Sequence, residues 1–473
     1  MTTIRDALDR LWTASDDARM VSTGEGWWTW GDVRSCAERI DRQLGDAGCG
    51  PGGRVGVVLG NRAESVAALL AILRAGRTLV TVSPLQPPER IADDLAMAGW
   101  SIDGDAVTTR AGGTDSDPAV AIEMRTSGTT GPPKRIPLTY KQVEASLVGP
   151  IGRMMRSAPL TGDVVVITVP IVHIGGLWAV LERLVTAQPF ALIEKFTVAE
   201  WHRAVTEHRP AFTALPPAAL RSVLDADIPP DDLSSIRAIN AGASPVDPDL
   251  VDAFHERYGI PVLILYGATE FTGSVAGWNL RDFTQQWKAK RGSVGRPFPG
   301  VALRVTDEDG AVVPAGTTGR LQIATARAGG EDWISTSDLA HVDTDGFLYI
   351  DGRADDVILR GGFKVSPDTV VNALRRHPSV ADAAVVGLPD PRLGHVPHAA
   401  VELRRGSRAS GDELRTHCRS LLTPYEVPVV VQVVDELPRG AAMKVDRRRL
   451  TEMLTPAQTV AGPGQESTHV NSR

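Results

Sequence analysis

The stretch Arg125–Lys134, RTSGTTGPPK, places hydroxyl groups, glycines and a lysine close together. Glycines let the backbone turn where a Cβ would clash, so successive N–H groups can converge on an anion. The lysine adds a positive charge suited to phosphate. A mostly apolar run, Ala119–Met124, precedes the loop and predicts a strand, at whose end open α/β sheets bind ligands. The stretch therefore predicts a phosphate-binding loop formed by Thr126, Ser127, Gly128, Thr129, Thr130, Gly131 and Lys134.

This loop differs from a Walker A loop, in which a lysine directly follows the glycine and a serine or threonine comes next. Pro132 and Pro133 separate the last glycine from the lysine, so the spacing excludes small G proteins and P-loop kinases. The next helix is predicted to start at Thr139, which forms a capping-box pattern with Gln142. A flexible surface turn is the alternative, but such turns rarely follow a strand with a buried pattern.

The composition is that of an ordinary globular protein. The chain has 473 residues, of which 42% are hydrophobic and 23% charged, so it is long enough for more than one domain. A net charge of −7 gives no reason to expect a nucleic-acid partner. Three scattered cysteines suit a reducing compartment. No stretch approaches the roughly 18 apolar residues of a membrane span, so we expect a cytoplasmic protein whose oligomeric state the sequence leaves open.

Helical and strand patterns alternate before Asp351, which predicts parallel sheets covered by helices. The expected helices are Thr3–Trp12, Ser65–Ala75, Thr197–His208 and Asp247–Tyr258, and the expected strands are Arg54–Leu59, Val164–Pro170, Ile236–Asn240 and Pro261–Leu265.

The pattern changes between Asp351 and Asp356, and a smaller α+β mixture follows. Its expected helices are Pro367–Arg376 and Gly411–Leu422, and its expected strands are Ala381–Gly387, His398–Arg404 and Pro428–Val434. We therefore predict an α/β protein with an N-terminal domain of parallel or mixed sheets, residues 1–354, and an α+β domain, residues 355–454. The tail, residues 455–473, is predicted to be disordered because it is rich in Pro, Gly, Ser and Thr without periodicity.

Three further segments carry chemically useful side chains. YGATE, Tyr266–Glu270, ends a predicted strand and offers a ring for stacking, a hydroxyl and an oxygen ligand for Mg²⁺. On these residues alone a Tyr–Gly turn with a solvated glutamate is the favoured interpretation, unless the strand lies in the same sheet as the glycine-rich loop. Asp338, which precedes a hairpin-like segment, and Arg353 could hold a ribose or remain solvated. Lys444, in LPRGAAMKVD, is on chemical grounds alone an ordinary loop lysine.

Taken together, RTSGTTGPPK, YGATE, SDLAHVDTDGFLYIDGRADDVI and LPRGAAMKVD resemble the adenylate-forming superfamily. That superfamily includes acyl- and aryl-CoA synthetases, adenylation domains of nonribosomal peptide synthetases and luciferase-type enzymes. The similarity extends from about Trp27 to Leu450, with the motifs in the family's order. It implies ATP-dependent activation of a carboxylic acid to an acyl-adenylate, with a small C-terminal domain that rotates on a hinge.

The resemblance also implies roles for individual residues. The glycine-rich loop would hold the β- and γ-phosphates of ATP, Thr269 would contact the α-phosphate, and Glu270 would bind Mg²⁺. Lys444 would be the catalytic lysine and Asp355 the hinge. The adenosine would be held by Gly242, Ala243, Ser244, Tyr266, Gly267, Asp338 and Arg353.

The acceptor and the acid follow from the same resemblance. The segment RGGFKV, Arg360–Val365, is similar to the loop of CoA ligases over which the pantetheine arm passes, and Gly361 and Gly362 would allow that passage. An acid–CoA ligase is therefore expected, with a stand-alone enzyme that loads a carrier protein as the alternative. A catalytically silent ATP-binding scaffold is disfavoured because it would not need Lys444, Glu270 and Asp338.

The expected acid pocket has few polar groups, which suits an aromatic, alicyclic or medium-chain acid. Its residues would be His173, Trp178, Asn240, Ala241, Ala268, Thr272 and Gly273. Three features depart from the family: Arg135 stands where a glycine is usual, Met443 replaces the glycine before the lysine, and Asp103–Asp117 is short.

Overall fold

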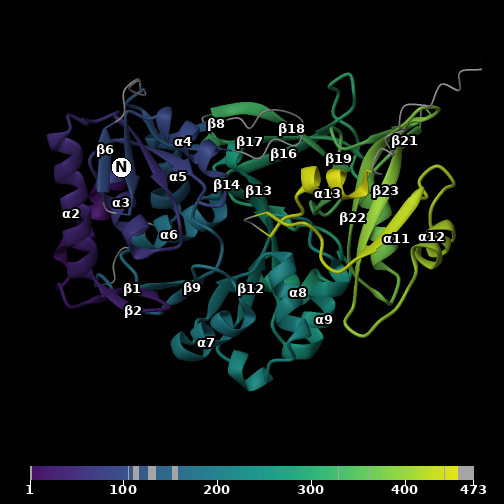
Figure 1. Ribbon diagram of the computed structural model, residues 1–473, viewed down its shortest axis with the longest axis horizontal. Coiled ribbons are helices and arrows are strands. Elements are labelled where there is room, and N and C mark those ends of the chain that lie inside the picture. The colour runs from purple at the N-terminus through teal and green to yellow at the C-terminus, as the bar shows by residue number, and fades with distance from the viewer. Residues whose placement is uncertain are drawn as a thin grey trace, which may run out of the picture. The chain divides into compact units, whose positions relative to one another are not determined.

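A computed structural model describes residues 3–104, 106–109, 117–125, 135–151, 158–328, 330–361, 363–440 and 443–455. The chain divides into two compact units. The first contains Met1–Asp355 together with Arg439–Lys444, and the second contains Asp356–Pro438 and the residues from Val445 onward. Each unit has its own sheets and core (Figure 1). The predicted tail lies outside the described residues after Thr455.

Two large sheets dominate the first unit. A nine-stranded sheet has the order β15 (Arg296–Pro297), β14 (Gly273–Gly277), β13 (Val262–Ala268), β12 (Ala238–Ala241), β11 (Phe212–Ala214), β9 (Val165–Ile167), β10 (Phe190–Leu192), β1 (Arg19–Thr23) and β2 (Gly26–Thr29). A six-stranded sheet has the order β6 (Ala106–Thr109), β5 (Trp100–Asp103), β3 (Arg54–Val58), β4 (Thr78–Val82), β7 (Val120–Arg125) and β8 (Arg135–Thr139). Neighbouring strands in the middle of both sheets are parallel, as expected.

Helix α3 (Ala63–Arg74) packs against β3 and β4 of the six-stranded sheet and against α1 (Ile4–Asp9) and α2 (Trp30–Asp46), in a core cluster that also includes residues of the nine-stranded sheet. Every residue from Ser65 to Leu73 is buried, because the sequence there is apolar on all sides rather than along one stripe. The same core cluster contains Val55 of β3 and Phe190 of β10. Other helices of the unit are α4 (Pro88–Ala96), α5 (Tyr140–Ile151), α6 (Ile174–Thr186), α7 (Val198–His208), α8 (Pro217–Asp225), α9 (Pro248–Tyr258) and α10 (Leu280–Gln286).

Local signals placed several of these helices correctly. The capping box predicted at Thr139 is formed: the Thr139 N–H donates to Gln142 Oε1 at 2.7 Å, and the Gln142 N–H donates to Thr139 Oγ1 at 3.2 Å. The predicted strand–helix–strand unit is present as β12, α9 and β13. Helix α9 begins after Asp247, whose side chain accepts from the Asp249 N–H, and ends at Gly259 in the left-handed conformation.

The first unit contains mixed sheets, as the predicted fold class allowed. Strands β16 (Val301–Thr306), β17 (Gly319–Thr325), β18 (Gly330–Val342) and β19 (Leu348–Arg353) form a separate antiparallel sheet. Asp338 lies in β18, within the hairpin that β18 forms with β19, and directly opposite Arg353. Antiparallel strands need only short connections, so no crossover helix marks them in the sequence.

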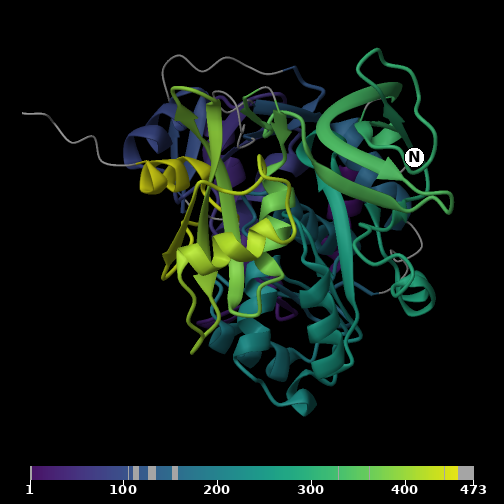
Figure 2. The same cartoon turned by 90° about the vertical axis from the view of Figure 1, so that its right-hand side faces the viewer.

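The second unit is an α+β sheet covered on both faces. Strands β21 (Phe363–Val365), β20 (Ile358–Arg360), β23 (Gly394–Leu403) and β22 (Val380–Asp390) pair in that order, and β24 (Val430–Val434) pairs with β23. Alternate residues of β22 face opposite sides. Val385 packs with α11 (Pro367–Arg375) and α12 (Gly411–Arg419), whereas Val386 packs with α13 (Arg447–Leu454). Strands β22 and β23 are the long yellow-green arrows of Figure 2. Helix α12 ends three residues earlier than predicted.

Asp94 holds together the ends of β7 and β8. It is 3% exposed and accepts hydrogen bonds from Arg125 Nη1 at 2.6 Å, Arg135 Nη2 at 2.9 Å and Gln86 Nε2 at 3.0 Å. Arg125 and Arg135 lie opposite each other across the two strands, where like charges would repel. Burial alone would raise the pKa of Asp94, but the hydrogen bonds from Gln86 and Arg125 and the charges of Arg135 and Arg125 outweigh it and lower the pKa.

We predict that Asp94→Asn destabilises the protein by about 3–5 kcal/mol, because it leaves two guanidinium groups without their buried partner. Because the folded-state pKa of Asp94 is lowered, the wild-type contribution is present above the unfolded pKa of about 4 and is lost as pH falls through the folded value. Denaturant unfolding between pH 3 and pH 7 measures both effects. Asp93→Asn, at an exposed neighbouring carboxylate, is the control. Equal unfolding free energies for the two variants would contradict the assignment.

Candidate functional site

The end of β13 and the 3₁₀ helix η4 (Thr269–Phe271) carry the YGATE residues. Only glycine fits at position 267, because β14 passes close to the backbone there. A Cβ at this position would lie 2.2 Å from the Gly273 carbonyl oxygen of β14. Glu270 is exposed and makes no hydrogen bond or ion pair with any described residue, so its carboxylate oxygens are open. This strand lies in the nine-stranded sheet, whereas β7 lies in the six-stranded sheet. A shared sheet therefore does not support a binding function for YGATE.

Instead, Tyr266 is linked to the antiparallel sheet through Asp338. The Tyr266 hydroxyl donates a short hydrogen bond to Asp338 Oδ2. Burial, followed by the adjacent Asp338 charge, raises the pKa of Tyr266, so the phenol stays protonated and keeps donating. Arg353 Nε lies 3.9 Å from Asp338 Oδ1. The structure thus brings together three predicted nucleotide-binding residues from β13, β18 and β19.

Arg353 is also held from its own end of β19. Its guanidinium contacts the Asp355 carboxylate at 2.8 Å and donates a short hydrogen bond to Ser337 Oγ. Ser337 was missed by the sequence analysis, since a lone serine in a strand gives no signal of its partner. Asp355, the predicted hinge residue, is thus paired with a predicted ribose-binding residue within the first unit.

Lys444 lies in the segment that packs with the first unit, although the chain around it belongs to the second. The residue as a whole is exposed, yet desolvation of its ammonium lowers its pKa. The charge of Arg353 lowers the pKa further, and the charge of Glu270 acts in the opposite direction. Lys444 is therefore within electrostatic range of two other predicted site residues. A hydrogen bond of 2.8 Å from the Gly440 N–H to the Lys444 carbonyl closes this loop.

Met443, a departure from the family, adopts a positive φ of 56° and packs its side chain partly against the core of the first unit. A glycine would reach this φ without a steric cost. Compared with a glycine, the methionine restricts the backbone directly before the lysine and adds an apolar side chain that packs against the core.

His173 is the N-cap of α6 and Trp178 lies within that helix. The charge of Lys444 acts on His173, and Trp178 faces Gly273 of β14. His173 Nε2 and Trp178 Nε1 are both buried without a hydrogen-bond partner among the described residues. Burial, followed by the charge of Lys444, lowers the pKa of His173 to about 4, so the imidazole is neutral at pH 7. The loop before His173 is held by Asn61, which accepts from the Ile171 N–H at 2.8 Å. Asn61 was not singled out from the sequence.

The remaining predicted residues lie at strand ends or outside the described chain. Asn240 and Ala241 end β12, Gly242 follows with its Cα hydrogen facing the Leu265 carbonyl, and Ala243 has a φ of 70°. Ser244, directly after Ala243, lies in a bend. Ala268 is the last residue of β13. Gly361, with a φ of 56°, lies in the second unit beside β20. The residues outside the described chain are Thr126, Ser127, Gly128, Thr129, Thr130, Gly131, Lys134 and Gly362.

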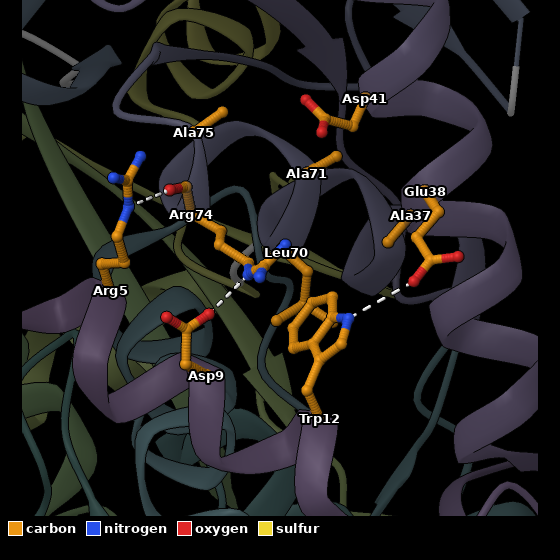
Figure 3. A pocket seen from close by; sticks show the side chains of 10 residues that line it. All are labelled: Arg5, Asp9, Trp12, Ala37, Glu38, Asp41, Leu70, Ala71, Arg74 and Ala75. Atoms are coloured by element: carbon orange, nitrogen blue, oxygen red, sulfur yellow. Dashed lines mark hydrogen bonds and ion pairs between the residues drawn. The ribbon is translucent and has the colours of Figure 1, made fainter.

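A cavity of about 380 Å³ lies elsewhere in the first unit, among α1, α2 and α3 (Figure 3). It contains none of the predicted site residues. Its charged groups are already paired: Arg74 Nε contacts Asp9 at 2.5 Å, and Trp12 Nε1 donates to Glu38 at 3.3 Å. We therefore interpret this cavity as part of the packing between the three helices.

In the part of the chain that the structure describes, no cluster of three or more potential metal ligands is present, and no helix is both long and apolar enough to cross a bilayer. A lone open carboxylate, such as that of Glu270, is compatible with Mg²⁺, which proteins often hold through one carboxylate together with substrate phosphates.

Known proteins resemble this chain over nearly its whole length. The AMP-binding enzyme family matches residues 9–102 and 105–328, and the AMP-binding enzyme C-terminal domain matches residues 370–444. A 2-succinylbenzoate–CoA ligase of Geobacillus kaustophilus is 30% identical, over 96% of this chain and 99% of the relative. A sulfoacetate–CoA ligase of Cupriavidus necator is also 30% identical, over 89% of this chain and 92% of the relative.

The fold agrees. The structure of o-succinylbenzoate CoA synthetase from Bacillus subtilis in complex with its acyl-adenylate intermediate superposes with a TM-score of 0.76 and 26% identity, covering 94% of this chain and 97% of that one. The expected fold class is confirmed by this agreement. The chain belongs to the AMP-binding enzyme family, the adenylate-forming enzymes.

Proposed function

We propose that the protein is an acid–CoA ligase that forms AMP. The observation that carries this proposal is the position of Lys444, which lies within electrostatic range of Glu270 and Arg353 in the unit that also holds Tyr266 and Asp338. The two relatives named above are both CoA ligases and match most of the chain. The acids they act on, 2-succinylbenzoate and sulfoacetate, each carry a second acidic group besides the carboxylate that is activated.

The residues support a two-step reaction. A carboxylate oxygen of the acid attacks the α-phosphorus of ATP, the bond to pyrophosphate breaks, and an acyl-adenylate forms. A thiolate of CoA then attacks the acyl carbon and AMP leaves. Asp338 and Arg353 are proposed to hold the ribose, with Tyr266 orienting Asp338 through its hydrogen bond. Gly242, Ala243 and Ser244 would border the adenine.

The barrier of the first step arises from negative charge crowded on phosphoryl oxygens. Lys444 is proposed to bridge the incoming carboxylate and the α-phosphate, where a preorganised cation stabilises the developing charge. Glu270 would hold Mg²⁺, which neutralises phosphate charge when bound. The bracketing arginines of the glycine-rich loop, Arg125 and Arg135, are tied to Asp94 and would hold the loop's two ends.

CoA is proposed as the acceptor because both named relatives are CoA ligases and because the sequence RGGFKV resembles that of CoA ligases. Strands β20 and β21 pair with each other and are anchored within the second unit. Arg360 donates to the carbonyl oxygens of Tyr425 and Val427 at 2.8 and 2.9 Å, and Phe363 stacks on Tyr425 with ring centroids 4.6 Å apart. We place the reaction in the cytoplasm, where the three buried cysteines would stay reduced.

A screen of carboxylic acids for pyrophosphate release tests the function. It is run with CoA, with a carrier protein bearing phosphopantetheine, and with neither. We expect acid-dependent release and a CoA thioester. Release that ignores CoA, followed by transfer of the acyl group to the carrier, would favour the carrier-loading alternative. Absence of acid-dependent release with any acceptor would contradict both.

We predict that Lys444→Ala lowers the rate of adenylate formation by about 10²–10³-fold, because it removes a preorganised charge from the transition state. Thiolation of a supplied acyl-adenylate by CoA should be unchanged. ATP–pyrophosphate exchange and thioester formation measure the two steps separately. Lys288→Ala, at an exposed lysine of the same unit, should leave both unchanged. Normal exchange in Lys444→Ala would end the assignment of this lysine.

The lowered pKa of Lys444 predicts a loss of activity at alkaline pH. The ammonium is charged below its pKa, so kcat/KM for adenylation should fall as pH rises through a value below the usual 10.4 or so of lysine. In Lys444→Arg the charge persists above pH 12 or so, and the alkaline fall should move upward. Lys290→Arg, at a lysine paired with Asp343 and Asp345, should keep the wild-type profile. If kcat/KM of Lys444→Arg falls at the same alkaline pH as that of the wild type, the loss of activity arises from the titration of another group.

A further inference from the structure

Arg327, in the short 3₁₀ helix η5 (Ala326–Ala328), is a partly buried cation. Its side chain donates a long hydrogen bond, 3.5 Å from Nη1 to the Ser274 carbonyl oxygen. Among the described residues, no carboxylate forms an ion pair with it. Burial lowers the pKa of Arg327.

Arginines in comparable surroundings of the same unit are compensated. Three of them are paired as follows: Arg54 with Glu123 at 2.6 Å, Arg77 with Asp41 at 2.5 Å, and Arg135 with Asp94 at 2.9 Å. Removing a guanidinium from water is costly unless an anion replaces the lost hydration. Arg327 therefore differs from these arginines in lacking a counter-ion supplied by the described chain.

The location of Arg327 connects it to the proposed acid pocket. Thr272 Oγ1 donates to the Arg327 carbonyl at 3.0 Å, and Arg327 Nη1 reaches the carbonyl of Ser274. Between these two contacts lies Gly273, which faces Trp178: a Cβ at Gly273 would lie 3.4 Å from Trp178 Cδ1 and 3.5 Å from Nε1. The arginine thus holds both sides of the point at which β14 meets the Trp178 ring.

Trp178, whose ring faces Gly273, carries a buried indole N–H that has no acceptor among the described residues. An indole nitrogen can only donate a hydrogen bond. A ligand that satisfied the indole and the guanidinium would have to bring acceptor oxygens, and one that matched the guanidinium charge would have to bring an anion.

We propose that Arg327 binds a second anionic group of the acid substrate, so that the preferred substrates are dianions: a dicarboxylate, or a carboxylate that also bears a sulfonate. This inference rests on the proposed function, because it concerns the acid that is activated. The carboxylate that reacts lies toward Lys444 and Glu270, and the second anionic group lies on the Gly273 side of the pocket. Arg327 is thereby a specificity-determining residue that the sequence analysis did not identify.

Matched pairs of acids test the proposal with the intact enzyme. Each pair differs in one charge: glutarate and monomethyl glutarate, phthalate and monomethyl phthalate, sulfoacetate and methylsulfonylacetate. In the wild type, kcat/KM for pyrophosphate release should be at least tenfold or so higher for the dianion of any pair that is turned over. In Arg327→Gln it should fall by about 10²-fold for the dianion, mainly through KM, with little change for the monoanion.

Two further variants separate recognition from folding. Arg327→Lys keeps the charge but not the bidentate geometry, and should retain part of the preference for dianions. Arg320→Gln alters an exposed arginine of β17 and should leave all pairs unchanged. Equal losses for dianion and monoanion in Arg327→Gln would show a structural role and overturn the proposal. If that variant does not fold, the wild-type comparison decides alone, and a preference for monoanions overturns it.

Failure of the proposed function has a different signature. If no acid supports ATP-dependent pyrophosphate release, the ligase activity is wrong, whereas recognition by Arg327 is still measured by calorimetry of the same acid pairs. Binding of a dianion that exceeds that of its monoanion by tenfold or so, and that is lost in Arg327→Gln, supports the anion site. Equal or undetectable binding of both members in the wild type then overturns it.

Discussion

The first unit depends on a helix that has no polar side. Helix α3 is buried from Ser65 to Leu73, and the core around it contains Val55 from one large sheet and Phe190 from the other. A helix with an exposed stripe could cover only one sheet, whereas this one must be covered on both sides. Strand β7, which ends directly before the glycine-rich loop in the sequence, and the YGATE segment belong to the same compact unit.

Within that unit, several buried or partly buried charges are compensated by partners in the described chain. Asp94 neutralises Arg125 and Arg135, and Asp338 is held by Tyr266 and lies near Arg353. Lys444 and Arg327 form no ion pair with a carboxylate of the described chain, although desolvation lowers the pKa of each. Cations left in this state are stabilised by anionic ligands. A nucleotide phosphate and a charged acid would supply the two missing partners.

Local signals were sufficient for several elements and insufficient for others. The two ends of α9 were predicted correctly from Asp247 and Gly259. A capping side chain and a left-handed residue act on backbone groups only a few positions away along the chain, so the sequence shows both. The antiparallel sheet of β16 to β19 was missed because pairing joins residues distant in sequence, such as Asp338 and Arg353. Helix α12 was drawn too long because Leu421 and Leu422 keep an apolar pattern while packing on the core beyond the helix end.

The sequence by itself determined the family and the fold class, because motifs such as RTSGTTGPPK and YGATE are contiguous and chemically explicit. It also singled out candidate side chains for nucleotide binding. Only the tertiary structure decided which of these side chains meet. It placed Arg439–Lys444 with the first unit, joined Tyr266 to Asp338 and explained Arg135 by Asp94. It also showed Arg327 beside Gly273 and Trp178. Burial and charge compensation are set by neighbours in space, and the linear order of residues does not specify them.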